Sequence, residues 1–481
     1  MAGRVLVVSY NFPPLGGVGI QRTLKYATYL PRWGWEPVVL TARNPGAALR
    51  DDDTSRSVPP GLLVERAFCP EPVKLRHALG GVARKLRGHG GRAPAEAPAA
   101  AGTTADGSGA ARGSGAAGRG SGTVARSHPR LAARLGPAWA AAMRLAFFPD
   151  EQIGWVPFAA RLGCGIHRRS PVDAVYSTFA PVSSHLAAAR IAGRTGLPWI
   201  ADFRDPWIGN AYVPPRRGLY GYLQRRIERR IVERADRLVF ATQGFLDGYA
   251  ERYPWAANKM RVIPNGYDRA DIPAPAAHDR GGSDSGRFRI AFGGSVYGEH
   301  ELEIFLDGLE LLVARRPEIR DRLKVVFIGW LSLHNQDVAA RYLSPERLGS
   351  MVRFTGFLPH REAVARMASA DALLQLVADG PNKAGHQGGK LLEYLGLDRQ
   401  ILAVVPEGKA RELLRELDWG VVADPTPEGV AGGVERLLAG PAPNRPADPT
   451  GRYDRVNLAG QLAALLDEIT GTSVGRGPSG T

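Results

Sequence analysis

Apolar residues along the chain occur either in short continuous runs or in longer segments where they recur every three or four positions. Segments of the second kind, such as 19–34 and 183–196, have the period of a helix with one buried face. They separate short runs that are typical of buried strands. In the first half these runs stand at 4–10, 36–42, 62–68, 173–179, 198–204, 237–242 and 260–265. Strands that alternate with helices predict an α/β fold with parallel sheets and crossover helices.

The alternation stops once, in the segment RADIPAPAAHDRGGSDSGR at 269–287, which is rich in proline, glycine and polar residues and has no period. We interpret this segment as a linker. Strand-like runs then resume at 288–294, 324–329, 351–356, 372–378, 400–405 and 420–423. The sequence therefore predicts two Rossmann-like domains, an N-terminal one at 1–268 and a C-terminal one at 288–470. We expect a last helix at about 455–469 and a disordered tail at 471–481.

Length and composition fit two large cores, because the chain has 481 residues of which 44% are hydrophobic. The two cysteines, Cys69 and Cys164, have neither metal-ligand nor disulfide spacing, which favours a reducing cytoplasm. The apolar run near the N-terminus is too short for a secretion signal. The best candidate for a membrane span, 131–148, is interrupted by Arg134 and Arg144. We therefore expect a cytoplasmic protein, at most associated with the cytoplasmic face of a membrane.

The net charge of +15 suggests an anionic partner: nucleic acid, an anionic membrane surface or phosphorylated small molecules. Part of the excess lies in 80–130, whose low apolar content predicts a disordered insertion. Another basic segment, LQRRIERRIVERADR at 223–237, mixes arginine with glutamate and is interpreted as a solvated helix face. No aromatic and basic platform for nucleic acid is evident. We expect no nucleic-acid partner, and possible recruitment to anionic lipid through the insertion.

Two glycine-rich loops follow the first predicted strand of each half. In open α/β sheets, ligands bind beyond the carboxyl ends of the strands. The loop NFPPLGGVGIQR at 11–22 lets the backbone approach a phosphate or sugar, although a tight turn is the alternative; Arg22 stands where a dinucleotide fingerprint has its third glycine. The loop FGGSVYGEHE at 292–301, which contains Gly294 and Ser295, is likewise a glycine turn that leads into a helix. Facing glycine loops predict a ligand in a cleft between the domains.

The stretch AGHQGGKLLEYLG at 384–396 places Lys390 and Glu393 three residues apart at the start of a short helix. Residues at this spacing share a helix face, so an intrahelical ion pair is one interpretation. The other is a phosphorylated ligand, because a helix N-terminus after Gly388 and Gly389 offers unpaired N–H groups and a positive dipole end. The motif alone leaves both interpretations open.

Two further loops carry polar candidates in the N-terminal half. His185 lies on a helix that Ser183 or Ser184 can cap, directly after the strand at 173–179, so it is either structural or in contact with a ligand. Asp202 and Arg204 lie in ADFRDPWIGN at 201–210. Arg204 either pairs with Asp202 or Asp205, or contacts an anionic or hydroxyl-rich substrate.

In their order and spacing, these stretches resemble the group 1 (family 4) glycosyltransferases of the GT-B fold. The resemblance covers nearly the whole chain outside 80–130 and the tail. It is carried by NFPPLGGVGIQR, FFPDEQIGWVPFA, YSTFAPVSSHLAA, PWIADFRDPW, VIPNGYD and KLLEYLGLDRQILAVVPEG. It implies transfer of a sugar from a nucleotide diphosphate donor, held mainly by the C-terminal domain, to a polysaccharide, glycolipid or metabolite on the N-terminal domain. Retention of configuration and independence of metals and other cofactors are implied as well.

The resemblance also assigns roles to residues. Glu393 matches the carboxylate that holds the donor ribose, and Lys390 with the helix N-terminus faces the diphosphate. His185 stands at the place of an active-site histidine, and Asp202 and Arg204 fall on the acceptor side. The donor-binding set comprises Gly16, Gly17, Gly19, Gly294, Ser295, Gly388, Gly389, Lys390 and Glu393.

Two departures from the family pattern keep alternatives open. The partner glutamate that often precedes Glu393 would fall on Gly385, and the second glycine loop has Glu299 and His300 where arginine and lysine are usual. Charge compensation would then fall on Lys390, helped by Lys383 or Arg22. A nucleotide-sugar-binding subunit without turnover, or a sugar phosphorylase or hydrolase of the same fold, are the competing interpretations. A metal-dependent GT-A enzyme is disfavoured, because the only Asp-x-Asp candidate, 51–53, lies in a polar loop.

Overall fold

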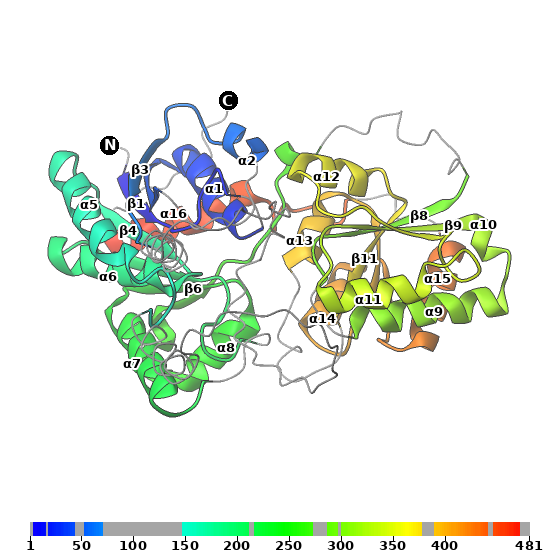
Figure 1. Ribbon diagram of the computed structural model, residues 1–481. Helices are drawn as coiled ribbons and strands as arrows, with labels where there is room; N and C mark the ends of the chain where they lie inside the picture. Colours follow the sequence, from blue (N-terminus) through cyan, green and yellow to red (C-terminus); the bar gives the residue numbers. More distant parts are fainter. Residues whose placement is uncertain are drawn as a thin grey trace, which may run out of the picture.

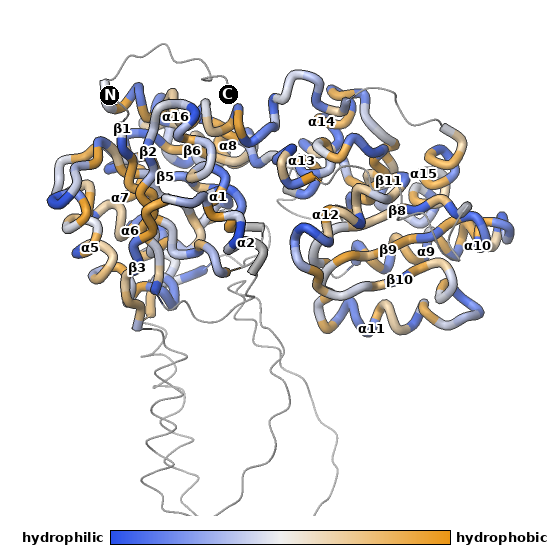
Figure 2. Tube along the Cα trace, turned by 90° about the horizontal axis from the view of Figure 1, so that it is seen from above, coloured by the Kyte–Doolittle hydropathy of each residue, from blue (hydrophilic) through white to orange (hydrophobic). Residues whose placement is uncertain are grey.

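The chain forms two α/β lobes side by side, as Figures 1 and 2 show from two directions. The computed structural model describes residues 3–15, 18–43, 52–70, 147–210, 216–272, 286–296, 300–377, 389–440 and 446–471. The predicted insertion at 80–130 lies outside these residues, as do Gly16, Gly17, Lys383 and Gly388 and all of the tail but its first residue. No described helix is long and apolar enough to cross a membrane.

The first lobe is built on seven parallel strands in the order β3-β2-β1-β4-β5-β6-β7. In the central strand, residues 5–8 are fully buried, as expected for a parallel strand covered on both faces. The strands are β1 (Gly3–Val8), β2 (Trp35–Ala42), β3 (Leu63–Ala67), β4 (Ala174–Thr178), β5 (Trp199–Phe203), β6 (Arg237–Phe240) and β7 (Met260–Val262). All seven fall on the strand-like runs of the sequence.

Helices cover both faces of this sheet. Leu6 and Val8 of β1 pack on one side with α5 (Trp155–Arg169), α6 (Val182–Thr195), α7 (Gly218–Arg234) and α8 (Gln243–Arg252). Val5 and Val7 pack on the other side with α1 (Val18–Tyr29) and η1 (Leu30–Trp33). The remaining short helices of the lobe are α2 (Asp52–Arg56), η2 (Pro254–Lys259) and η3 (Arg269–Asp271).

The second lobe has six parallel strands in the order β10-β9-β8-β11-β12-β13. They are β8 (Phe288–Gly293), β9 (Leu323–Ile328), β10 (Val352–Phe354), β11 (Ala372–Leu376), β12 (Gln400–Val404) and β13 (Val421–Ala423). One face packs on α9 (Glu301–Arg315), α10 (Ile319–Arg322), α11 (Leu333–Tyr342) and α15 (Pro427–Ala439). The other packs on α12 (His360–Ala368), α13 (Gly389–Gly396) and α14 (Lys409–Leu417). The predicted α/β fold of two parallel-sheet, Rossmann-like lobes is confirmed.

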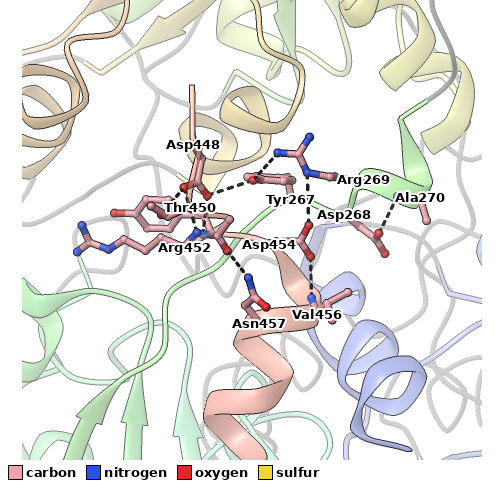
Figure 3. A network of polar contacts seen from close by, with 12 residues as sticks. Tyr267, Asp268, Arg269, Ala270, Asp448, Thr450, Arg452, Asp454, Val456 and Asn457 are labelled. Atoms are coloured by element: carbon pink, nitrogen blue, oxygen red, sulfur yellow. Dashed lines mark hydrogen bonds and ion pairs between the residues drawn. The ribbon is translucent and has the colours of Figure 1, made fainter. Parts of the chain in front are cut away.

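The chain passes between the lobes twice, and the two crossing segments are hydrogen-bonded to each other (Figure 3). The Tyr267 N–H donates to the Tyr453 carbonyl at 3.0 Å, and the Arg455 N–H donates to the Tyr267 carbonyl at 2.9 Å. The Tyr267 hydroxyl donates to Asp448 at 3.1 Å, and the same carboxylate accepts the backbone N–H groups of Arg452 and Tyr453. The two segments that connect the lobes are therefore hydrogen-bonded to each other at the point where they cross.

The returning segment leads into α16 (Arg455–Thr470), which packs on the first lobe. Its buried leucines, including Leu458, Leu462 and Leu466, join Val5 and Val7 of β1 in one core. The sequence-based division at 288–470 assigned this helix to the second half. Its position differs because the apolar face of a helix shows that the helix is packed, but not against which lobe.

Candidate functional site

The second glycine loop lies at the carboxyl end of β8. Gly294 has a φ of +105°, in the left-handed region that favours glycine. A Cβ atom at this position would also lie 2.5 Å from Cε of Lys390. Gly294 is therefore required twice, by its backbone conformation and by the lysine that crosses it.

Lys390, in the first turn of α13, reaches this loop. Its Nζ donates to the Ser295 carbonyl at 3.0 Å and lies 4.1 Å from the ring centroid of Phe292. Burial lowers the pKa of Lys390 to about 8. The Tyr394 hydroxyl hydrogen-bonds Gly293 N–H at 2.8 Å and so holds α13 against β8. A cation, a glycine turn and a helix N-terminus thus meet at one edge of the sheet, an arrangement that suits an anion.

Glu393 points elsewhere, into a pocket at the junction of the lobes. His360, the first residue of α12, lies with Nε2 at 3.9 Å from Glu393 and at 3.7 Å from Asp271. Burial alone would lower the pKa of His360, but the carboxylates of Asp271 and Glu393 raise it overall. The other residues that line the pocket are Gln21, Gly266, Tyr267, Asp268, Ile272, Val364, Leu397 and Arg455.

Lys390 and Glu393 therefore have different neighbours, although they are three residues apart on one short helix. The partners of Lys390 are a carbonyl and an aromatic ring of the glycine loop, whereas Glu393 lies 3.9 Å from Nε2 of His360. The interpretation as an intrahelical ion pair is not supported by this geometry.

Arg204 lies at the carboxyl edge of the first sheet. It donates to the Gly19 carbonyl at 2.7 Å, and a Cβ atom on Gly19 would lie 2.5 Å from the same guanidinium nitrogen. Arg204 also pairs with Asp205 at 3.2 Å, as one of the two sequence interpretations predicted. Its side chain is 18% exposed, so it packs over the first turn of α1 and still reaches the surface.

Asp202 lies in the core, contrary to its expected place on the acceptor side. It is fully buried and accepts two hydrogen bonds from Arg22, at 2.7 and 3.1 Å, and one from the Tyr176 hydroxyl. Arg22 also donates to the carbonyls of Ile263 and Pro264. Burial lowers the pKa of Arg22, but the Asp202 carboxylate raises it overall. Arg22 is thus committed to this buried pair, and the suggestion that it helps to neutralise a diphosphate is not supported.

His185 is also buried, contrary to the expectation of an active-site histidine. Its side chain is fully inaccessible and packs against Phe203, with ring centroids 4.6 Å apart. Nδ1 is 2.8 Å from the Ser177 hydroxyl, which accepts a hydrogen bond from the indole of Trp199. Burial lowers the pKa of His185 to about 3. The ring is therefore neutral and does not reach a substrate in this structure. The position of His185 after a strand correctly predicted that it lies at the carboxyl edge of the sheet, but its side chain points into the core.

The structure brings together Gly294, Ser295, Gly389 and Lys390 at the second sheet, with Glu393 one turn further at the lobe junction. Sequence reasoning missed His360 and Arg455, which line the same pocket. His360 begins the helix that follows the strand run at 351–356, so the rule that ligands lie beyond strand ends pointed to it. Among the residues that the structure describes, no three His, Cys, Asp or Glu side chains are grouped to hold a metal ion.

Comparisons with known proteins agree with this architecture. Residues 110–266 match the family model of the glycosyl transferase 4-like domain. No curated protein matches the chain. A glycosyltransferase from Rickettsia africae is similar in structure, with a TM-score of 0.59, 12% identity and coverage of 98% of this chain and 99% of that one.

Two further solved structures are similar over almost their whole length. Sucrose-phosphate synthase from Thermosynechococcus elongatus has a TM-score of 0.58 and 13% identity, with 98% of this chain and 100% of that chain covered. HepE from Anabaena, in complex with UDP and glucose, has a TM-score of 0.55 and 15% identity, with 97% and 100% covered. At these identities the likeness shows a shared fold. The chain therefore contains a glycosyl transferase 4-like domain at 110–266 and has the two-lobe α/β architecture of the GT-B fold.

Proposed function

We propose that the protein transfers a sugar from a nucleoside diphosphate sugar, bound on the second lobe, to a carbohydrate, lipid-linked or small-molecule acceptor on the first. The observation that carries the proposal is the position of Lys390. Its ammonium group lies beside the Gly294–Ser295 turn, in the first turn of α13. A diphosphate at this edge would meet a fixed cation and unpaired backbone N–H groups at once.

This arrangement suits the chemistry of glycosyl transfer. When the bond between the anomeric carbon and the diphosphate breaks, negative charge grows on the leaving phosphate. Groups that are fixed where the charge develops stabilise the transition state more than the ground state. Lys390 is such a group, because Ser295 and Phe292 hold it in place. Glu393, 29% exposed at the lobe junction, would accept hydrogen bonds from the ribose hydroxyls of the donor.

The first donors to test are UDP-sugars, because structural neighbours were solved with UDP and with UDP-glucose. The assay follows release of the nucleoside diphosphate with and without acceptor. We expect release that depends on acceptor in the wild type and a large loss in Lys390→Gln. Lys409→Gln is the matched control, since Lys409 is half-buried on α14 of the same lobe and pairs with Glu412.

Other outcomes of this screen distinguish the competing functions. Release of nucleotide into water or phosphate, without acceptor, would indicate a hydrolase or phosphorylase. Donor binding without release from any donor would indicate a nucleotide-sugar-binding subunit. Equal activity of Lys390→Gln and the control would refute the placement of the diphosphate.

Independence of metal ions is part of the proposal, because Lys390 and the helix N-terminus would supply the positive potential that a metal ion supplies in other transferases. We expect transfer to survive treatment with EDTA. Loss of activity in EDTA that returns with Mg²⁺ or Mn²⁺ would contradict this part. Retention of configuration is proposed from the family resemblance and is checked by the anomeric configuration of the product.

A further inference from the structure

The outer layer of the first lobe, made of α5, α6 and α7, is strongly basic. Figures 1 and 2 show these helices along the side of the lobe that is turned away from the second lobe. They carry ten exposed arginines, three on α5, two on α6 and five on α7. Glu233 is the one exposed acidic residue of the three helices. Much of the excess charge of the described chain is therefore concentrated on one face.

Most of these arginines are not engaged in holding the lobe together. Arg229 pairs with Glu233 at 2.7 Å, an exposed pair of the kind that contributes little to stability. Arg190, Arg226 and Arg230 form no ion pair with any other described residue. The other acidic residue of α7, Glu228, is buried. The positive charge of this face is therefore available to a partner.

Exposed apolar side chains lie at one end of the same face. Leu219 and Tyr222, in the first turns of α7, are 63% and 53% exposed. They lie three residues apart, and Arg226 and Arg230 follow at intervals of four, so all four residues form one stripe along the helix. The outward stripe of α7 is thus apolar at its start and basic along the rest. A fully solvated helix face gives no reason for the two large apolar residues.

A second apolar pair lies at the same edge of the sheet. Phe158, in the first turn of α5, is 45% exposed and packs edge-on against Phe68 with centroids 5.4 Å apart. Helices that return between parallel strands begin at the carboxyl edge of the sheet, so the first turns of α5 and α7 share that edge. The ring of Phe148, which precedes α5, contacts that of Tyr220 in the first turn of α7, with centroids 5.8 Å apart, and so links the two helix starts. The apolar residues therefore occupy the edge that also carries Arg204.

We propose that this surface docks on an anionic lipid bilayer. Leu219, Tyr222 and Phe158 would enter the interface between headgroups and acyl chains, and the arginines would contact lipid phosphates, as on amphipathic helices that lie in the membrane plane. A nucleic acid would contact the arginines but would offer no apolar environment for the aliphatic side chain of Leu219. If the proposed transfer holds, docking brings the acceptor edge of the first lobe to the bilayer, which suits a lipid-linked acceptor.

The test measures binding of the full chain to phosphatidylcholine vesicles with and without phosphatidylglycerol. The variant Arg190→Gln/Arg226→Gln/Arg230→Gln is compared with a matched triple in the second lobe, at exposed arginines 315, 322 and 353. Each arginine near an anionic surface multiplies the partition coefficient about fivefold, so we expect roughly a hundredfold loss in the first triple. The second triple removes the same net charge and should bind nearly as the wild type.

The apolar end is tested separately by Leu219→Gln/Tyr222→Gln, with Leu333→Gln, at a residue 77% exposed on α11, as the control. The double variant should bind the anionic vesicles several-fold more weakly, and the control should not. Equal binding of the two arginine triples, or equal binding to neutral and anionic vesicles, would overturn the proposal. So would a loss of RNA binding in the first triple without a loss of vesicle binding. Vesicle binding needs no donor, so Lys390→Gln should bind like the wild type even if the proposed transfer fails.

Discussion

The burial of Lys390 leads to a specific pH dependence of the transfer. Free lysine titrates near 10.4, but burial lowers the pKa of Lys390 to about 8. Only the protonated form can neutralise the growing charge on the diphosphate. At pH 9 about one tenth of the free enzyme carries the charge, so kcat/KM should fall about tenfold for each pH unit above 8. The neighbouring phenol of Tyr394 has a pKa raised by burial and does not titrate in this range.

Bound donor should change the profile in a predictable direction. An anionic diphosphate beside Lys390 favours the charged amine, which raises its pKa in the complex. The basic limb of kcat should therefore lie at higher pH than that of kcat/KM, because kcat reports the enzyme–substrate complex. The assay is initial-rate transfer between about pH 6 and 10 at varied donor concentration.

Two variants make this reasoning refutable. Lys390→Arg keeps its charge throughout the range, so its profile should lack the basic limb, whatever its absolute rate. Lys390→Gln should be slow at every pH and equally flat. A wild-type profile that stays level to about pH 9.5, or a basic limb that persists in Lys390→Gln, would show that another group titrates and that Lys390 does not face the donor phosphate.

Three further predictions concern the residues around the site and in the first core. Gly294→Ala should lower kcat/KM for the donor about as much as Lys390→Gln, since it displaces that side chain, while Gly193→Ala, with open space around its Cβ position, serves as the control. Arg22→Met should lower the free energy of unfolding of the first lobe by about 3–5 kcal/mol, because it leaves Asp202 buried and unpaired, and urea titration should show no such loss in Arg32→Met. His185 binds no proton when folded until about pH 3, whereas the unfolded chain binds one below about 6.5. Wild-type stability should therefore fall by about 1.4 kcal/mol for each pH unit below 6.5 through this residue alone, and His185→Leu should show a weaker decline.

The strands were predictable because each is a short run of apolar residues between turn signals. Buried parallel strands need little more than this, and all thirteen runs fall on strands of the two sheets. The contact between Lys390 and the second glycine loop was also predictable, because the start of a helix and the end of a strand meet at the carboxyl edge of a parallel sheet.

The direction of individual side chains was not predictable in the same way. Asp202 and Arg22 are separated by 180 positions, and nothing local shows that they form one buried pair. His185 lies at the expected edge, but the hydroxyl of Ser177 and the rings around it draw the imidazole into the core. Whether a polar residue next to a strand end faces substrate or core depends on partners that are far away in sequence.

The same holds for the helix that ends the chain, and it affects how the protein is made. Leu458, Leu462 and Leu466 of α16 complete a core whose members outside this helix lie between Val5 and Ile263. During synthesis that face of the first sheet stays uncovered until some two hundred further residues have been added, roughly 10–40 s at usual translation rates. The second lobe can be complete before the first. A chain that ends before α16 would therefore have one folded lobe and one exposed apolar face, to which chaperones would bind.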